Sequence, residues 1–317
     1  MRIRLPPAIG VFKPSVWDGR TPDFRSVTCV PVDTRIAIVT MAYNEPDFVR
    51  IWVDYYGRQL GTRNCYIVDH GSDDGSTSGL GEVNVMRIPR SPQDDPKRAR
   101  FLSHFCSSLL EWYNVVMYVD IDEIAVADPR YYADLRSFCT DVHQPVLNAI
   151  GLNVIHLMGH ELPYQASRLV LSQRSWVFRS SSMCKPVIIR RPVVWAPGFH
   201  SADAPAAFSQ LYLFHLRWYD LDTGLRRLAK TREMAWEYPD AGDHQKVSDE
   251  ELVQQFTGFS SLMPDERDLD AGTDPVRAFT DAVLASQFGR ENETFRITLD
   301  IWPDTIWRIP ERFRSCF

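Results

Sequence analysis

The sequence contains no apolar run as long as the roughly 18 residues that a membrane-spanning helix requires. Its N-terminal segment, MRIRLPPAIGVFKP, has two arginines but no apolar stretch typical of a signal peptide. The six cysteines include no C-x-x-C pair, so they favour reduced, mostly buried thiols of a cytoplasmic protein over a disulfide framework. A net charge of −6 argues against a nucleic-acid-binding protein, which is normally basic.

The chain has 317 residues, of which 44% are hydrophobic. This composition excludes a disordered protein and supplies enough apolar surface for one large domain or two smaller ones. No internal repeat and no low-complexity tract interrupts it. We divide the chain into an N-terminal arm (1–34), a first half (35–125), a second half of the same domain (126–240) and a C-terminal helical extension (241–317).

The first half alternates apolar runs with helical stripes. Continuous apolar runs without alternation predict strands that are buried on both faces, and residues repeating at helical spacing predict helices. The predicted strands are 36–39, 65–68, 83–88 and 115–119, and the predicted helices are 48–60 and 99–110. This β-α-β-β-α-β order favours a parallel sheet with right-handed crossovers and helices on both faces, hence a Rossmann-like α/β fold.

Polar residues follow three of the predicted strands. They are Tyr43-Asn44-Glu45, the loop that begins at Asp69, and Asp120-Ile121-Asp122-Glu123. Ligands of parallel sheets bind beyond the carboxyl ends of the strands. We therefore expect these three segments to converge on one binding edge.

Asp120 and Asp122 point the same way, because alternate residues of a strand share a face. Paired carboxylates suit a hard divalent cation such as Mg²⁺ or Mn²⁺, which can neutralise a diphosphate leaving group. The alternative is a solvated strand end.

Asp69 can accept hydrogen bonds from a uracil N–H or from ribose hydroxyls, and Gly71 allows close backbone approach. The alternative is an Asx turn that closes the loop. The segment from Tyr43 to Pro46 could hold base and ribose, or could begin a helix with Asn44 as its cap.

The motifs carried by these three segments resemble those of bacterial family 2-like glycosyltransferases. The similar segments are Thr40 to Glu45, Tyr66 to Ser76 and Tyr118 to Glu123, followed by Lys185 to Arg190, Gly198-Phe199-His200 and Phe214-His215. The resemblance covers residues 35 to 235. It implies a GT-A fold with a mostly parallel sheet and a smaller acceptor-side region, a nucleotide-sugar donor and Mn²⁺ or Mg²⁺.

The resemblance also implies roles for single residues. Asp120 and Asp122 would bind the metal, with His200 or His215 completing its shell; each histidine could instead be structural. The implied donor-binding residues are Ala42, Tyr43, Asn44, Glu45, Asp69, Gly71, Asp120, Ile121, Lys185 and Arg190.

An inverting transfer needs a general base that deprotonates the acceptor hydroxyl. Of the candidates His156, His160 and Glu161 we favour Glu161, because related enzymes place acceptor-side residues in this stretch; Asp203 is its main rival.

The leading hypothesis is a cytoplasmic glycosyltransferase that moves a sugar, with UDP as the expected carrier, to a glycan or lipid-linked acceptor. No nucleic-acid partner is expected, and contact with the inner membrane face is permitted but not required. A sugar-1-phosphate nucleotidyltransferase is the second hypothesis, although Tyr43-Asn44-Glu45 stands where those enzymes carry a Gly-rich basic loop. A non-catalytic nucleotide- or glycan-binding module is the third.

Overall fold

A computed structural model describes residues 34–238, 240–291, 294–302 and 304–317. The predicted N-terminal arm therefore lies outside the described residues, except for Thr34. The described part forms one compact unit, Thr34–Phe317. Its main sheet has the strand order β10-β13-β7-β6-β8-β4-β1-β2-β3, and β9 pairs with both β5 and β6.

The first half folds as its pattern predicts. Strands β3, β2, β1 and β4 lie side by side and are all parallel. Their bounds, with the two helices that connect them, are β1 (Ile36–Ala42), α1 (Pro46–Leu60), β2 (Cys65–Asp69), β3 (Asn84–Arg87), α2 (Asp95–Leu109) and β4 (Val115–Tyr118). The chain is thus an α/β protein with a central sheet.

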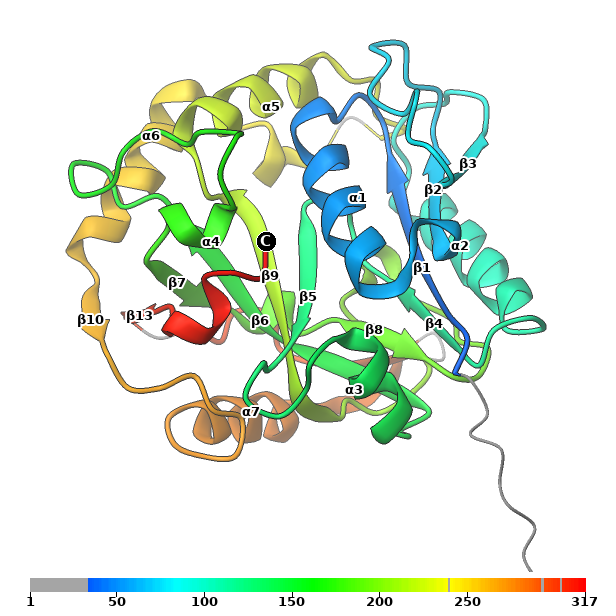
Figure 1. The fold of residues 1–317 in the computed structure, drawn as a ribbon. Helices are drawn as coiled ribbons and strands as arrows, with labels where there is room; N and C mark the ends of the chain where they lie inside the picture. Colours follow the sequence, from blue (N-terminus) through cyan, green and yellow to red (C-terminus); the bar gives the residue numbers. More distant parts are fainter. Residues whose placement is uncertain (1–33, 239, 292–293, 303) are drawn as a thin grey trace, which may run out of the picture. The chain divides into compact units, whose positions relative to one another are not determined.

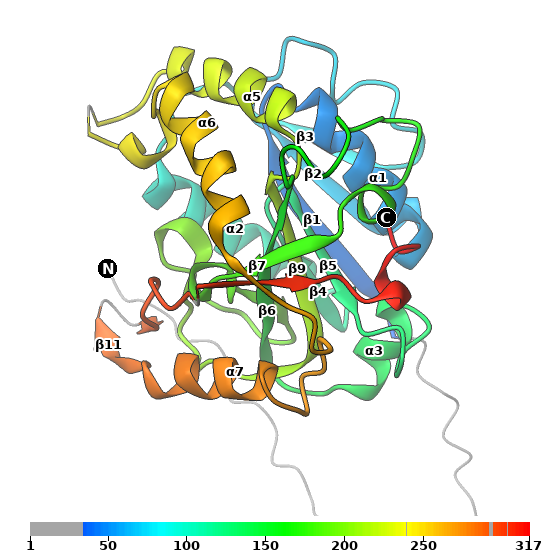
Figure 2. The ribbon, with the colours of Figure 1, turned by 90° about the vertical axis from the view of Figure 1, so that its left-hand side faces the viewer.

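Helices α1 and α2 cover opposite faces of β1. Ile36 and Ile38 pack into a core that includes Trp52 of α1, whereas Ala37 and Val39 pack into a core that includes α2. Alternate residues of β1 therefore meet different helices, which is why its sequence is apolar without alternation. Figure 1 shows α1 in front of β1, and Figure 2 shows the sheet from the side.

The second half adds mostly antiparallel pairings. It comprises β5 (Glu123–Ala127), α3 (Leu135–Asp141), β6 (Val146–Ile155), α4 (Val170–Gln173), β7 (Trp176–Arg179), β8 (Pro186–Ile189), β9 (Phe208–Trp218) and α5 (Leu221–Glu233). β8 runs antiparallel to β4, and β5 runs antiparallel to β9. The apolar run 193–195 contributes only an isolated bridge between Trp195 and Ala202.

The sequence predicted a helical C-terminal extension, but this segment contains strands as well as helices. It contains α6 (Asp249–Gly258) and α7 (Val276–Ala285), but also β10 (Met263–Asp265), β11 (Phe288–Glu291), β12 (Thr294–Arg296) and β13 (Thr305–Arg308). β13 pairs with β7 and so extends the main sheet. At the start of α6, Ser248 and Glu251 form a capping box, each side chain bonded to the other residue's backbone amide.

The described cysteines are free, and four of the five are buried; Cys29 lies outside the described residues. Within the described ranges, no helix has both the length and the apolar character needed to cross a bilayer.

Candidate active site at the carboxyl edge of the sheet

The three predicted polar segments meet at one edge. Register pairs Ala42, the last residue of β1, with Asp69, the last of β2, and Val39 with Tyr118 at the end of β4. Asn44 fastens the first two loops together, because its Nδ2 donates to Asp73 (2.7 Å) while its Oδ1 accepts from the Asp73 amide (3.0 Å). Asn44 does not cap α1; the N-cap is Glu45, with Pro46 in the first turn.

Asp69 is buried at the end of β2. Its Oδ1 accepts from the amide of Ser72 (2.7 Å), one residue further along the chain than in an Asx turn, and its Oδ2 accepts from Arg87 (2.8 Å). Gly71 has φ 78°, and a Cβ there would lie 2.8 Å from Arg90, so a larger residue cannot replace it without moving this loop. The Arg90 guanidinium stacks 3.7 Å above the Tyr43 ring.

Asp120 lies among three donors. Its Oδ1 accepts from Tyr118 (2.9 Å) and from Arg98, and its Oδ2 accepts from Lys185 (2.8 Å). Lys185 also donates to Glu123 (2.6 Å). Burial alone would raise the pKa of Asp120, but the cations of Lys185 and Arg98 hold it well below its usual value. The carboxylate is therefore ionised at neutral pH.

Asp122 faces a histidine. Its Oδ2 lies 3.1 Å from Nε2 of His215 and also accepts from Arg227. Burial works against ionisation, yet Arg227 and His215 lower the pKa of Asp122 well below its usual value. Nδ1 of His215 lies 2.7 Å from Oδ1 of Asn153, which can only accept, so Nδ1 carries the proton.

This tautomer matters for metal binding. In the neutral imidazole, a proton on Nδ1 leaves a lone pair on Nε2, and this lone pair faces a carboxylate oxygen of Asp122. Two lone pairs at that distance repel each other unless a cation or a proton lies between them. A histidine whose other nitrogen donates to an acceptor, as His215 does to Asn153, is the usual arrangement of a metal ligand.

Within the described residues, no group of three or more His, Cys, Asp or Glu side chains is arranged to hold a metal ion. Asp122 and His215 could supply two ligands to a cation that takes its other ligands from a diphosphate and water. Asp120, the other predicted metal ligand, accepts hydrogen bonds from Tyr118, Arg98 and Lys185.

No family model and no curated protein matches the chain. Solved structures that it resembles include a mannosyltransferase from Pyrobaculum calidifontis in complex with GDP-Man and Mn²⁺ (16% identity, TM-score 0.27) and a mannose-1-phosphate geranyltransferase from Thermus thermophilus (7% identity, TM-score 0.29). The likenesses cover 45% and 71% of this chain and 41% and 65% of those chains. Likenesses this weak leave the function to be inferred from the chain's own side chains.

His200 is partly buried, and its Nδ1 lies 2.6 Å from the carbonyl oxygen of Ser182. Since a carbonyl only accepts, Nδ1 carries the proton here too, and the lone pair is on Nε2. Burial, aided by the nearby cation of Lys185, lowers the pKa of His200 to about 4. The neutral imidazole keeps His200 available as a ligand.

This shift predicts a pH dependence of stability. The unfolded chain, with an ordinary histidine pKa of about 6.5, binds the proton more strongly than the folded chain, so stability falls as pH drops from about 6.5 towards 4. The cost approaches roughly 3 kcal/mol at the lower end. We expect His200→Gln, unfolded by urea in EDTA at pH 7 and pH 4.5, to lose less stability than wild type across this interval. Equal losses in the two proteins would contradict the shift.

Arg190 does not reach this edge. Because β8 is antiparallel to β4, Lys185 before β8 lies beside the end of β4, whereas Arg190 after β8 lies at the opposite edge. There Arg190 donates to the carbonyl oxygens of Cys139 and Val142 at the end of α3. We leave it out of the site.

The two predicted bases are also engaged elsewhere. Glu161 accepts from the backbone amides of Ser175 (2.6 Å) and Leu157 (3.0 Å), so its carboxylate joins two loops. Asp203 accepts from Arg191 and from the amide of Val194, both at 3.2 Å. None of these described contacts involves the residues around Asp122.

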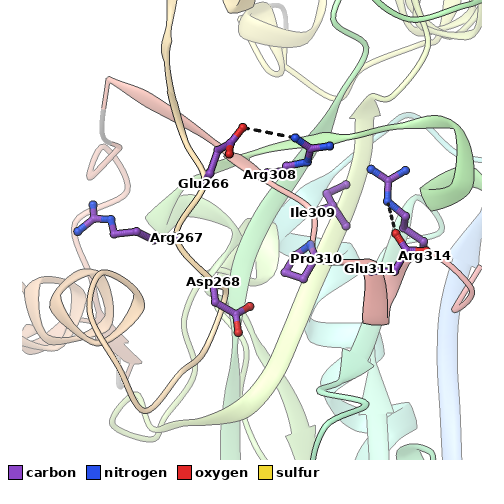
Figure 3. A pocket seen from close by; sticks show the side chains of 8 residues that line it. All are labelled: Glu266, Arg267, Asp268, Arg308, Ile309, Pro310, Glu311 and Arg314. Atoms are coloured by element: carbon purple, nitrogen blue, oxygen red, sulfur yellow. Dashed lines mark hydrogen bonds and ion pairs between the residues drawn. The ribbon is translucent and has the colours of Figure 1, made fainter.

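A surface pocket of about 320 Å³ lies apart from the predicted residues, between the segment after β10 and the segment after β13 (Figure 3). Its charged side chains are paired: Glu266 with Arg308, and Arg314 with Glu311. Arg267 and Asp268, which also line the pocket, have ion-pair partners outside it. With its charges neutralised in this way, the pocket does not suggest a catalytic site.

Proposed function

We propose that the chain is a metal-dependent glycosyltransferase that uses a nucleotide-sugar donor, with UDP as the expected carrier. The bond from the sugar C1 to the diphosphate oxygen would break, the electron pair leaving with the diphosphate. A hydroxyl of a glycan or lipid-linked acceptor would attack C1 from the opposite face and lose its proton to a base, giving inversion. The observation that carries this proposal is the Asp122–His215 pair, set at the sheet edge where β1, β2 and β4 end.

Asp122 and His215 would hold the Mn²⁺ or Mg²⁺. When bound, such a cation offsets the negative charge that develops on the departing diphosphate. Asn153 supports the pair by fixing the His215 ring through Nδ1. His200 remains a candidate further ligand, since its Nε2 is unprotonated at neutral pH.

Asp69 would bind the nucleoside. Each of its oxygens accepts one described hydrogen bond and, as a carboxylate oxygen, can accept another from a uracil N–H or a ribose hydroxyl. Asp120 would contact the ribose, held in place by Tyr118 and Lys185. Neither Glu161 nor Asp203 enters this proposal.

The proposal is tested with a panel of UDP- and GDP-sugars incubated with Mn²⁺, with or without candidate acceptors. We expect release of UDP or GDP, suppressed at least about tenfold by EDTA, because the leaving diphosphate loses its cation. A panel that yields neither nucleotide, with no binding of UDP or GDP by calorimetry, would contradict the proposal. Pyrophosphate released from a nucleoside triphosphate and a sugar 1-phosphate would instead identify a nucleotidyltransferase.

A further inference from the structure

Helix α5 carries two cations that reach the opposite half of the fold. Arg227 and Lys230 are three residues apart and so share one face of the helix. Nε of Arg227 lies 3.2 Å from Oε1 of Glu45, and Nζ of Lys230 lies 2.6 Å from the same oxygen. Figure 1 shows α5 above the end of β1. These contacts place both cations at the predicted binding edge.

Lys230 also donates to the carbonyl oxygens of Tyr43 (3.1 Å) and Asn44 (2.9 Å). The loop after β1 is therefore held to α5 by contacts between residues more than 180 positions apart. Neither cation is fully enclosed: the Arg227 and Lys230 side chains are 28% and 22% exposed.

Arg227 donates a hydrogen bond to the oxygen of Asp122 that would bind the proposed metal ion. Its Nη1 donates to Oδ2 of Asp122, the same oxygen that faces Nε2 of His215. A divalent cation on this oxygen and the guanidinium repel each other, so the two compete for Asp122.

The charges around Asp122 balance without any ligand. Four carboxylates, Glu45, Asp120, Asp122 and Glu123, are paired with four cations, Arg98, Lys185, Arg227 and Lys230. Asp95, 4.0 Å from Arg98, and Arg217, which interacts electrostatically with Asp122 and Arg227, add one further charge of each sign. A divalent cation adds two positive charges, and the diphosphate of a nucleotide sugar adds two negative ones. Binding of either alone would leave a net charge in a mostly buried site, which is costly. Binding of both preserves the balance.

We infer that Arg227 and Lys230 are diphosphate-binding residues of the donor site, held on Asp122 and Glu45 until metal and donor arrive together. This inference rests on the proposed function. As the cation takes Asp122, Arg227 is freed to pair with the phosphate oxygens that accompany it. Arginine and lysine are the side chains that commonly bind phosphate, the former through two parallel N–H donors.

The test measures Mn²⁺ and nucleotide affinities separately by isothermal titration calorimetry. UDP and GDP are titrated into wild type with saturating Mn²⁺, and whichever binds is then used with the variants. We expect Arg227→Gln to bind that nucleotide at least about tenfold more weakly, since one charge-assisted contact is worth more than 1.4 kcal/mol. Without nucleotide, the same variant should bind Mn²⁺ at least threefold more tightly, because the competing guanidinium is gone.

Arg227→Gln is thus expected to weaken nucleotide binding and to strengthen Mn²⁺ binding. These opposite changes distinguish a diphosphate-binding Arg227 from a merely structural one. A merely structural Arg227 would lower both affinities when replaced, and an uninvolved one would change neither; each result overturns the inference. Lys230→Gln should weaken nucleotide binding but leave Mn²⁺ affinity within about twofold, because Lys230 has no described hydrogen bond to Asp122. Arg232→Gln, on the same helix but paired with Asp249, is the matched control and should change neither affinity.

The same titrations distinguish this inference from the proposed function. Wild type that binds neither UDP nor GDP overturns both. Wild type that binds one of them, together with an Arg227→Gln variant of unchanged affinities, overturns only the assignment of the α5 cations.

Discussion

Replacing Asp122 by Asn is expected to abolish metal-dependent release of nucleotide, with a loss of about a thousandfold or more. The substitution keeps the shape of the side chain but removes the negative charge that would bind the proposed cation beside His215. Metal stabilisation of a leaving group is worth several kcal/mol, and about 4 kcal/mol corresponds to this factor. The measurements are initial rates with Mn²⁺, Mn²⁺ affinity and urea unfolding.

Asp128→Asn is the matched control for Asp122→Asn. Asp128 is fully buried and, like Asp122, is paired with an arginine, in this case Arg312 (2.7 Å). Its replacement should lower the free energy of unfolding while leaving the rate at 25 °C unchanged, because Asp128 lies outside the proposed site. If Asp122→Asn retained wild-type turnover, or if both variants lost turnover equally, Asp122 would not be a metal ligand.

Replacing Lys185 by Met is expected to lower the free energy of unfolding by about 3–5 kcal/mol. Lys185 is 6% exposed and lies between Asp120 (2.8 Å) and Glu123 (2.6 Å). Although burial alone would lower it, the two carboxylates raise the pKa of Lys185 above its usual value, so the side chain is a full cation at neutral pH. Without it, the buried carboxylate of Glu123 and the partly exposed carboxylate of Asp120 lose their common partner. Urea unfolding at pH 7 measures the loss.

A second substitution tests the electrostatic origin of this loss. The double variant Lys185→Met with Glu123→Gln carries one fewer unpaired carboxylate, so it should be more stable than Lys185→Met alone. Lys246→Met, at a lysine paired with the exposed Asp243, should cost less than about 1 kcal/mol. If Lys185→Met were as stable as the Lys246→Met control, the buried ion pair of Lys185 would not contribute to the stability of the fold.

The sequence could predict those residues of the candidate site that lie at the ends of strands. Asp69, Asp120 and Asp122 follow apolar runs, and the crossover rule places the carboxyl ends of parallel strands together. Lys185 was also among the predicted donor-binding residues, and it does lie at this edge. The prediction for Lys185 came from the resemblance of the segment Lys185 to Arg190 to a family motif, and not from the periodicity of the sequence.

Arg98, Arg227 and Lys230 were missed. Arginine is abundant throughout the chain, so no single one stands out, and α5 shows nothing in its own pattern that points to a loop more than 180 residues earlier. β5 was missed as well, because Glu123–Ala127 follows the D-x-D turn so closely that it reads as part of it.

Local sequence by itself determined the alternation of strands and helices in the first half, and with it the edge where Asp69, Asp120 and Asp122 lie, because strand burial and crossover handedness are encoded within about ninety residues. Only the tertiary structure decided which cations meet those carboxylates, and that Arg190 lies at the far edge. Such pairings depend on strand direction and on helix placement between distant segments, and ion pairs leave no periodic trace in a sequence.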